Sequence, residues 1–135
     1  GETLISLYSE DKRQRSGFDP RNSAFSPDGK WLAFAKDDAL DIWDVSTGKR
    51  IAEFPPDDAK DFGGICFSPD GRQILLGIRS SERLQYGCRL YDSTTRKLLL
   101  SSPESAASSV LFSPDGQWLV VHNGETIKIH QASSG

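Results

Sequence analysis

A five-residue string, Phe-Ser-Pro-Asp-Gly, occurs three times in this chain and limits its possible folds more than any other feature. The copies occupy residues 25–29, 67–71 and 112–116, a spacing of 42 and then 45 residues. With ordinary amino-acid usage, a specified pentamer is expected on the order of once per million positions. Three copies in 135 residues therefore mark a repeated structural unit.

Each copy of the string has the chemistry of a tight turn. Proline presets the backbone of the second turn position, aspartate accepts hydrogen bonds from nearby backbone, and glycine adopts the left-handed conformation that side chains resist. Short apolar segments rich in strand-forming residues flank every copy, such as residues 31–35 after the first. The string is therefore predicted to connect the first two strands of each repeat as a β-hairpin.

Further strands align between the copies. The second strand of each repeat is expected at 30–35, 72–77 and 117–122, and the third at 39–44, 87–92 and 126–131. The third strand alternates, with apolar second and fourth positions around a charged third. A fourth strand is expected at 50–54 and 97–101, but the third copy has none before Gly135. Residues 2–8 fit that missing position, so the sequence predicts an all-β chain of three four-stranded units.

The aligned residues resemble the WD-repeat β-propeller family, whose repeats of about 40–45 residues form four-stranded blades and often end the third strand with Trp-Asp. Trp43-Asp44 is that dipeptide, Tyr91-Asp92 is a near variant, and His130-Gln131 departs from it. The Gly-His dipeptide common in the family is absent, so the repeats are more similar to divergent bacterial ones. The resemblance implies one propeller unit over 1–135, with antiparallel blades at about 21–54, 63–101 and 107–131.

Three blades leave a closure problem, because propellers ordinarily have four to eight blades. A lone chain would expose an apolar sheet face at each end. We expect identical chains to complete the ring, with a six-blade homodimer favoured and a nine-blade homotrimer ranked second. A closure strand carrying Leu4, Ile5 and Leu7 would pair with the strand of Ile127 and Ile129 in the next copy. The absence of any methionine also favours a piece excised from a longer propeller chain, and the two ideas are compatible.

Composition narrows the classes of function. The formal charge of −3, from 16 basic and 19 acidic side chains, disfavours a nucleic-acid-binding surface. No apolar run approaches the roughly 20 residues of a membrane span, and no N-terminal signal peptide is visible. Cys66 and Cys88 lack metal-site spacing and are expected to be buried free thiols, with a disulfide or a reactive thiol as the alternative. A reducing, cytoplasmic compartment is therefore expected.

No catalytic, cofactor or metal site is expected. His122 and His130 lie in predicted strands, without a nucleophile elbow. The acidic segment 57–61 lacks the alternating oxygen ligands, glycine and distal glutamate of a calcium loop. The rival interpretation is an enzymatic site at the central channel of the ring. Such a site would have to use the polar side chains near the first strands, which are Asn22, Ser23, Ser108 and Ser109.

An insertion at residues 79–86 lengthens the loop between the second and third strands of the second repeat. Repeat insertions often lie on a binding face, and Arg79, Arg83 and Tyr86 belong to residue types enriched in interfaces. The family resemblance implies a non-enzymatic scaffold for protein–protein interaction, with a protein partner that the sequence does not identify. A purely structural or engineered fragment, with no partner beyond itself, is the other alternative.

Overall fold

A computed structural model of the chain describes residues 20–36, 39–54, 62–79, 86–102 and 107–132, and within them the fold is almost entirely β. The first sheet contains β1 (Ser23–Phe25), β2 (Trp31–Lys36), β3 (Ala39–Asp44) and β4 (Lys49–Phe54), preceded by the short 3-10 helix η1 (Pro20–Asn22). The second sheet contains β5 (Phe62–Phe67), β6 (Gln73–Arg79), β7 (Tyr86–Asp92) and β8 (Leu98–Ser102). The third sheet contains β9 (Ser109–Phe112), β10 (Trp118–His122) and β11 (Ile127–Gln131).

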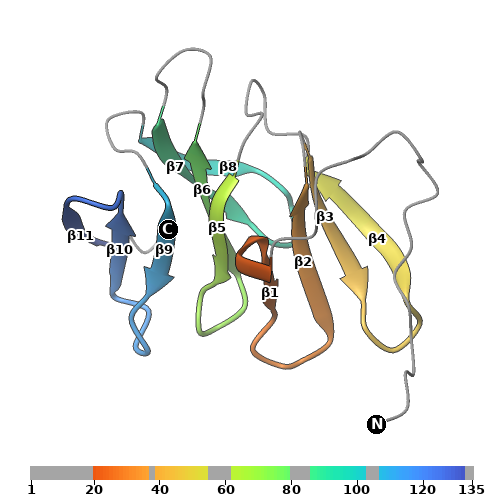
Figure 1. Cartoon of the computed structure of the whole chain (residues 1–135). Helices are drawn as coiled ribbons and strands as arrows, with labels where there is room; N and C mark the ends of the chain where they lie inside the picture. The colour runs from red at the N-terminus through yellow and green to blue at the C-terminus, as the bar shows by residue number, and fades with distance from the viewer. Residues whose placement is uncertain (1–19, 37–38, 55–61, 80–85, 103–106, 133–135) are drawn as a thin grey trace, which may run out of the picture.

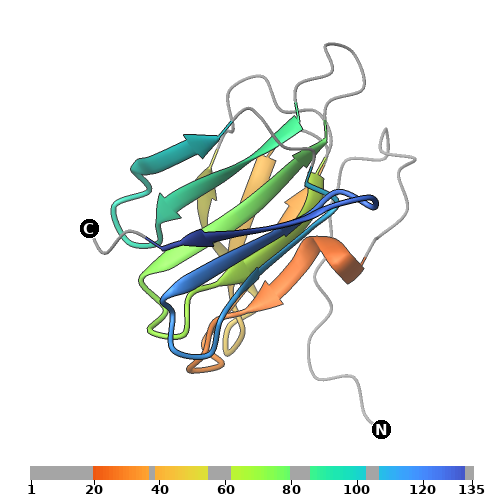
Figure 2. The same ribbon diagram turned by 90° about the vertical axis from the view of Figure 1, so that its left-hand side faces the viewer.

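Each sheet is an antiparallel meander, with strand orders β1-β2-β3-β4, β5-β6-β7-β8 and β11-β10-β9. The three sheets stand side by side (Figure 1), and the turned view in Figure 2 shows them stacked face to face. Strand β5 contacts both β1 and β9, the first strands of the other two sheets. The first strands therefore converge on one side of the stack. Three antiparallel sheets in this arrangement confirm the predicted propeller-type fold class.

The strands lie within two residues of the ranges expected from the repeat. Strand β3 matches its expected range, whereas β6 continues to Arg79 and β8 begins at Leu98. Residues 2–8, predicted as the fourth strand of the closing unit, lie outside the described residues. The third sheet consequently has three strands within the part of the chain that is described.

The three Phe-Ser-Pro-Asp-Gly turns share one hydrogen-bond pattern. In the second sheet, Ser68 Oγ donates to Asp70 Oδ1 at 2.6 Å, and the Arg72 N–H donates to the same oxygen at 3.0 Å. The Gln73 N–H in turn donates to Ser68 Oγ at 2.9 Å. Gly71 has a φ of +74°, in the left-handed region that favours glycine. The other two turns repeat these bonds, so each hairpin is closed by residues of its own turn.

The aspartate of the Trp-Asp dipeptide closes a second turn, between the third and fourth strands. Asp44 Oδ1 accepts hydrogen bonds from the N–H groups of Ser46 and Thr47, at 2.9 and 3.0 Å. Asp92 makes the corresponding two bonds in the second sheet. Aspartate can cap a turn in this way because its short side chain reaches the backbone two and three residues further on. The dipeptide therefore has a local structural role here.

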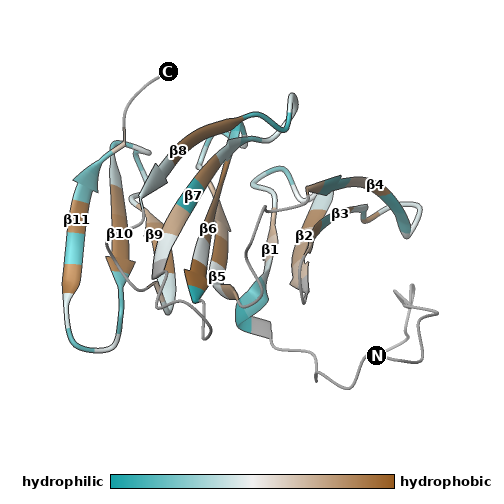
Figure 3. Cartoon of the chain, turned by 90° about the horizontal axis from the view of Figure 1, so that it is seen from above, coloured by the Kyte–Doolittle hydropathy of each residue, from teal (hydrophilic) through white to brown (hydrophobic). Residues whose placement is uncertain are grey.

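Two apolar cores lie between the sheets, one on each side of β6. Ile74 and Leu76 belong to the core shared with the first sheet, and Leu75 belongs to the core shared with the third. All three side chains are fully buried, although successive strand residues point to opposite faces. Figure 3 shows the corresponding apolar colouring along β6, viewed from above. The second sheet is therefore the centre of the fold, covered on both faces.

Candidate interaction surfaces

The third sheet presents apolar side chains on the face that points away from the second sheet. Val120 in β10 pairs with Leu111 in β9 and with Ile129 in β11, so these three form a row across the sheet. Trp118 and Ile127 share this face because residues two apart on a strand point the same way. Val120 is half-buried and the other four are exposed. We call these five residues the third-sheet outer face; Figure 3 shows its apolar bands on β11.

The repeat shows what normally covers such a face. Ile127 and Ile129 are 66% and 65% exposed. The same two positions of the other repeats are occupied by residues at most 5% exposed, namely Leu40, Ile42, Cys88 and Leu90. The first two of these lie in the core against the second sheet, and the last two in the core against the third. One pair of repeat positions is thus buried twice beneath the following sheet and exposed in the last copy.

The first sheet has a corresponding face on its far side. Phe25 pairs with Leu32, and Leu32 pairs with Trp43, so the three form a row across β1, β2 and β3. We call these three residues the first-sheet outer face. Phe25 is 63% exposed, whereas Phe67, at the same position of the next repeat, is 8% exposed. Leu32 and Trp43 are half-buried. The two ends of the stack therefore both carry apolar side chains at positions that are covered inside it.

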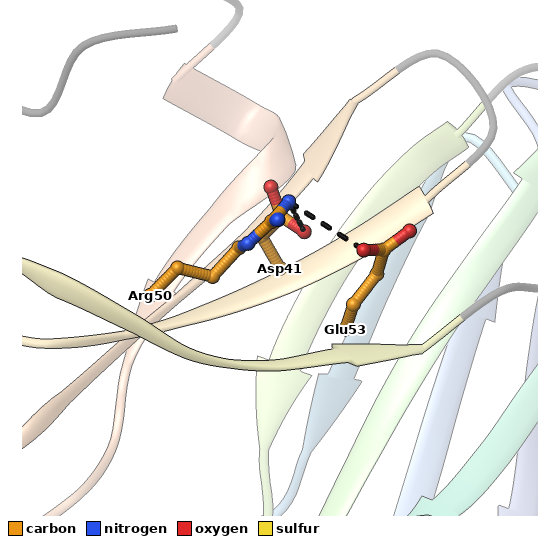
Figure 4. Close-up of polar contacts among 3 residues, drawn as sticks. All are labelled: Asp41, Arg50 and Glu53. Atoms are coloured by element: carbon orange, nitrogen blue, oxygen red, sulfur yellow. Dashed lines mark hydrogen bonds and ion pairs between the residues drawn. The ribbon is translucent and has the colours of Figure 1, made fainter.

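A small ion-pair cluster borders the first-sheet outer face. Arg50 Nη1 in β4 lies 3.5 Å from Asp41 Oδ1 and 3.5 Å from Glu53 Oε2 (Figure 4). Asp41 is two residues from Trp43 on β3 and therefore shares its face. The side chains of Arg50 and Glu53 are about half exposed, so solvent screens both pairs, and such pairs contribute about 0–1 kcal/mol. The cluster mainly gives the apolar face a charged border.

The turns of neighbouring sheets also touch one another. A Cβ atom placed on Gly71 would lie 3.6 Å from Cδ of Pro27, in the preceding turn. A Cβ atom on Gly116 would lie 3.5 Å from Cδ of Pro69, again in the preceding turn. These are ordinary van der Waals distances, so each turn glycine packs beside the proline of the turn before it. The contact occurs at both junctions between sheets, so the two junctions share one turn-to-turn arrangement.

The predicted interaction loop is placed differently from its expected position. Arg79 is the last residue of β6, Tyr86 is the first of β7, and the two are paired across the strands. The expectation that both lie in the loop is therefore wrong, because the antiparallel ladder continues beyond the buried Ile78. Arg83 lies outside the described residues. A binding role for these three residues stays a prediction.

Of the predicted closure residues, Ile127 and Ile129 lie together on the third-sheet outer face. Leu4, Ile5 and Leu7 lie outside the described residues, so the strand pairing remains a prediction. Leu111, Trp118 and Phe25 were not predicted from the sequence as residues of an interaction surface. The internal alignment of the three repeats could have identified these three residues. Each lies at a repeat position where the side chain of another copy packs against a neighbouring sheet.

Both cysteines are free. Burial raises the pKa of Cys66 to about 12, partly opposed by a backbone hydrogen bond from Phe112, and burial also raises the pKa of Cys88. Neither thiol is activated for nucleophilic chemistry. Within the described residues, no group of three or more His, Cys, Asp or Glu side chains could hold a metal ion. Within the described part of the chain, no helix is long and apolar enough to cross a membrane.

No protein-family model matches the chain. It is 31% identical over 126 residues to the WD repeat-containing protein sll1491 of Synechocystis sp., a match covering 87% of this chain and 34% of the relative. It is 36% identical over 62 residues to a WD repeat-containing protein of Deinococcus radiodurans, covering 44% and 23%. It is 23% identical over 117 residues to SAGA complex subunit Spt8 of Schizosaccharomyces pombe, covering 85% and 22%. The chain spans about a third or less of the length of each relative.

Among solved structures, the chain is similar to hydrazine synthase of Kuenenia stuttgartiensis, with a TM-score of 0.66 and 21% sequence identity. The match covers 81% of this chain and 33% of that one, and at this identity it concerns the fold alone. The repeated turn, the three stacked antiparallel sheets and the WD repeat-containing relatives agree. The chain is therefore built from divergent WD-repeat β-propeller blades, and its three sheets are those blades.

Proposed function

We propose that this chain is a non-enzymatic scaffold that binds protein through the end faces of its stack of blades. The observation that carries the proposal is the third-sheet outer face, where Ile127 and Ile129 are exposed at positions that are buried in both other repeats. Full burial of one large apolar side chain contributes roughly 1.5–3 kcal/mol, and the face carries five. A protein surface is the partner that can cover such a face.

The state of the cysteine and turn aspartate side chains favours a scaffold over an enzyme. The thiol pKa values are raised, and the aspartates of the repeated turn accept hydrogen bonds from serines of their own turns. One relative is named as a subunit of the SAGA complex, so that protein is part of a larger assembly. The segment of Arg79, Arg83 and Tyr86 is proposed to bind the unidentified protein partner, because self-assembly would cover the end faces.

The proposal extends to self-assembly. Propellers close with four to eight blades, so two copies of a three-blade chain make a six-blade ring. Three copies would make nine blades and rank second. In the ring, the segment of Leu4, Ile5 and Leu7 would add a fourth strand beside β11, whose outer edge pairs with no described strand. Such pairing would satisfy the exposed backbone groups of that edge.

Light scattering coupled to gel filtration tests this proposal. The chain has a mass of 14.9 kDa, and we expect a species of twice that mass, populated increasingly as concentration rises. The matched variants are Ile129→Lys, which places a charge on the third-sheet outer face, and Leu99→Lys on the exposed outer strand β8. Only the first is expected to shift the equilibrium to the monomer. A folded wild-type monomer at every concentration would contradict self-assembly.

A further inference from the structure

Each sheet in the stack has two unlike faces, one turned to the preceding sheet and one turned to the following sheet. At both junctions within the chain, the face turned forward meets a face turned back. The third-sheet outer face is turned forward, and the first-sheet outer face is turned back. The two ends of the stack therefore carry the two unlike halves of the junction that the chain already makes twice.

We infer that the third-sheet outer face of one copy binds the first-sheet outer face of a second copy, head to tail, in the stacking geometry of the two internal junctions. The inference rests on the proposed self-assembly and adds its partner surface. A heterologous contact of this kind closes into a ring when the rotation per blade permits it. A like-with-like contact between two third sheets is the competing arrangement.

Side-chain chemistry at the repeat positions supports unlike pairing. On the faces turned back, Phe25 corresponds to Phe67, and Trp43 corresponds to Tyr91, so both carry aromatic rings. Inside the stack, the ring of Tyr91 lies 5.7 Å from the ring of Phe54 on the first sheet, edge to face. On the faces turned forward, the third strands instead present small or aliphatic side chains, and Ile127 and Ile129 continue this pattern. Each end of the stack therefore resembles its internal counterpart, and the two ends together supply the two unlike faces of a junction.

The turn contacts leave two matching halves as well. Gly71 and Gly116 each pack beside the proline of the preceding turn. Gly29 belongs to the first turn, and no described heavy atom would lie within 4 Å of a Cβ placed on it. Pro114 belongs to the last turn, so no later turn of the described chain meets it. Head-to-tail stacking brings Gly29 of one copy beside Pro114 of the other, whereas like-with-like contact leaves both without their counterpart.

Blocking one end at a time tests the inference. Phe25→Glu blocks the first-sheet outer face, and Ile129→Lys blocks the third-sheet outer face; both side chains are mostly exposed, so neither change disturbs a core. Burying an unpaired charge in the contact is expected to weaken self-association of each variant at least about 100-fold. An equimolar mixture of the two variants retains one unmodified junction, between the unblocked ends, and should form a 1:1 heterodimer. Leu99→Lys is the control, with wild-type association.

The possible outcomes distinguish the head-to-tail contact from self-assembly in general. Association only in the mixture, measured by native mass spectrometry with one variant isotope-labelled, supports head-to-tail contact. Self-association of Phe25→Glu alone, with Ile129→Lys monomeric, would show third sheet on third sheet and overturn the inference while leaving self-assembly intact. A monomeric wild-type chain would contradict the proposed self-assembly itself.

Cysteine cross-linking gives a second readout that does not depend on charge. With an added mild oxidant to accept the two electrons, a chain with Gly29→Cys and a chain with Pro114→Cys should form a disulfide only when mixed. The reason is that the corresponding internal atoms lie at van der Waals distance. The matched control is the single chain carrying Pro27→Cys and Gly71→Cys, which should form the same bond internally. Cross-linking in the control but not in the mixture would overturn the head-to-tail contact. Burial raises the pKa of both native thiols, so we expect them to react slowly in this experiment.

Discussion

The second and third sheets are copies of one repeat, yet side chains at the same repeat position are buried in one sheet and exposed in the other. In the second sheet, Leu90 is buried by the third sheet and Tyr91 by the first. In the third sheet, Ile129 occupies the position of Leu90 and is exposed. The second and third strands of the two sheets pair in the same register. Whether an apolar side chain is buried in this fold therefore depends on a neighbouring sheet. The sequence of the strand indicates only that the side chain needs a covering surface.

The sharpest test of this comparison truncates the same repeat position in both sheets. Leu90→Ala removes a fully packed side chain and is expected to lower the free energy of unfolding by about 3 kcal/mol. Ile129→Ala should change it by less than about 0.5 kcal/mol in dilute, monomeric chain. Urea denaturation followed by tryptophan fluorescence measures both. Equal losses would mean that the third-sheet outer face is covered within a single chain.

A smaller loss of stability is expected from a substitution at the place where the backbone of the second sheet approaches the backbone before β9. A Cβ on Gly63 would overlap the carbonyl oxygen of Ala107, which precedes β9 of the third sheet. Gly63→Ala is therefore expected to cost about 2 kcal/mol, because backbone must shift. Gly29→Ala, which meets no described atom within 4 Å, should cost about 1 kcal/mol for its left-handed backbone alone. Thermal unfolding of the two variants gives the comparison, and a Gly63→Ala protein as stable as wild type would contradict the close approach.

The turns should show the same contrast at lower magnitude. Ser68 is buried and bonds to Asp70 and to the Gln73 N–H, so Ser68→Ala is expected to cost about 1–2 kcal/mol. Ser113 makes the equivalent bonds at the solvent-facing third sheet. Ser113→Ala should cost about half as much, because water replaces the lost bonds. The urea midpoints of unfolding of the two variants measure this difference. A larger loss of stability for Ser113→Ala than for Ser68→Ala would contradict the expected ranking.

Acid should weaken all three turns together. Hydrogen bonds from the neighbouring serine hydroxyl, and then from the backbone, lower the pKa of Asp28, Asp70 and Asp115. A lowered pKa in the folded state means that the ionised group stabilises the fold above the unfolded pKa of about 4, and that this is lost as pH falls through the folded value. The urea midpoint of unfolding should therefore decrease as the pH is lowered below about 4. A triple Asp→Asn variant should be less stable at neutral pH and show a flatter acid limb; an unchanged limb would contradict the assignment.

The smallest effect is expected at the border of the first-sheet outer face. Arg50→Ala removes the two ion pairs with Asp41 and Glu53, but Arg50 and Glu53 are half exposed. The free energy of unfolding should change by less than about 0.5 kcal/mol, and the change should vanish in high salt. Denaturation at low and high salt measures it. A loss above about 1 kcal/mol would show that the cluster is shielded from solvent.

Much of the fold could be predicted because the repeat carries its own local chemistry. The Ser-Pro-Asp-Gly turn fixes where strands begin, and apolar alternation fixes which faces are buried, as at Leu40 and Ile42. The end of β6 at Arg79 could not be predicted, because a polar residue in a ladder is indistinguishable by composition from one in a loop. The exposed state of Phe25 and Leu111 also could not be read from their residue types. Their exposure follows from position in the stack, which depends on contacts far apart in sequence.

The self-contained turns have a consequence for how the chain acquires its structure. The hydrogen bonds within each Phe-Ser-Pro-Asp-Gly turn join residues no more than five positions apart, such as the Trp31 N–H and Ser26 Oγ. Short loops of this kind close on a timescale of about 10–100 ns and a hairpin forms within about 1–10 μs, so three hairpins can form independently before any sheets dock. Folding can then start at any repeat and propagate by accretion of neighbours. Such modular kinetics also suit a unit that gains or loses copies by gene duplication, because an added hairpin brings its own nucleus.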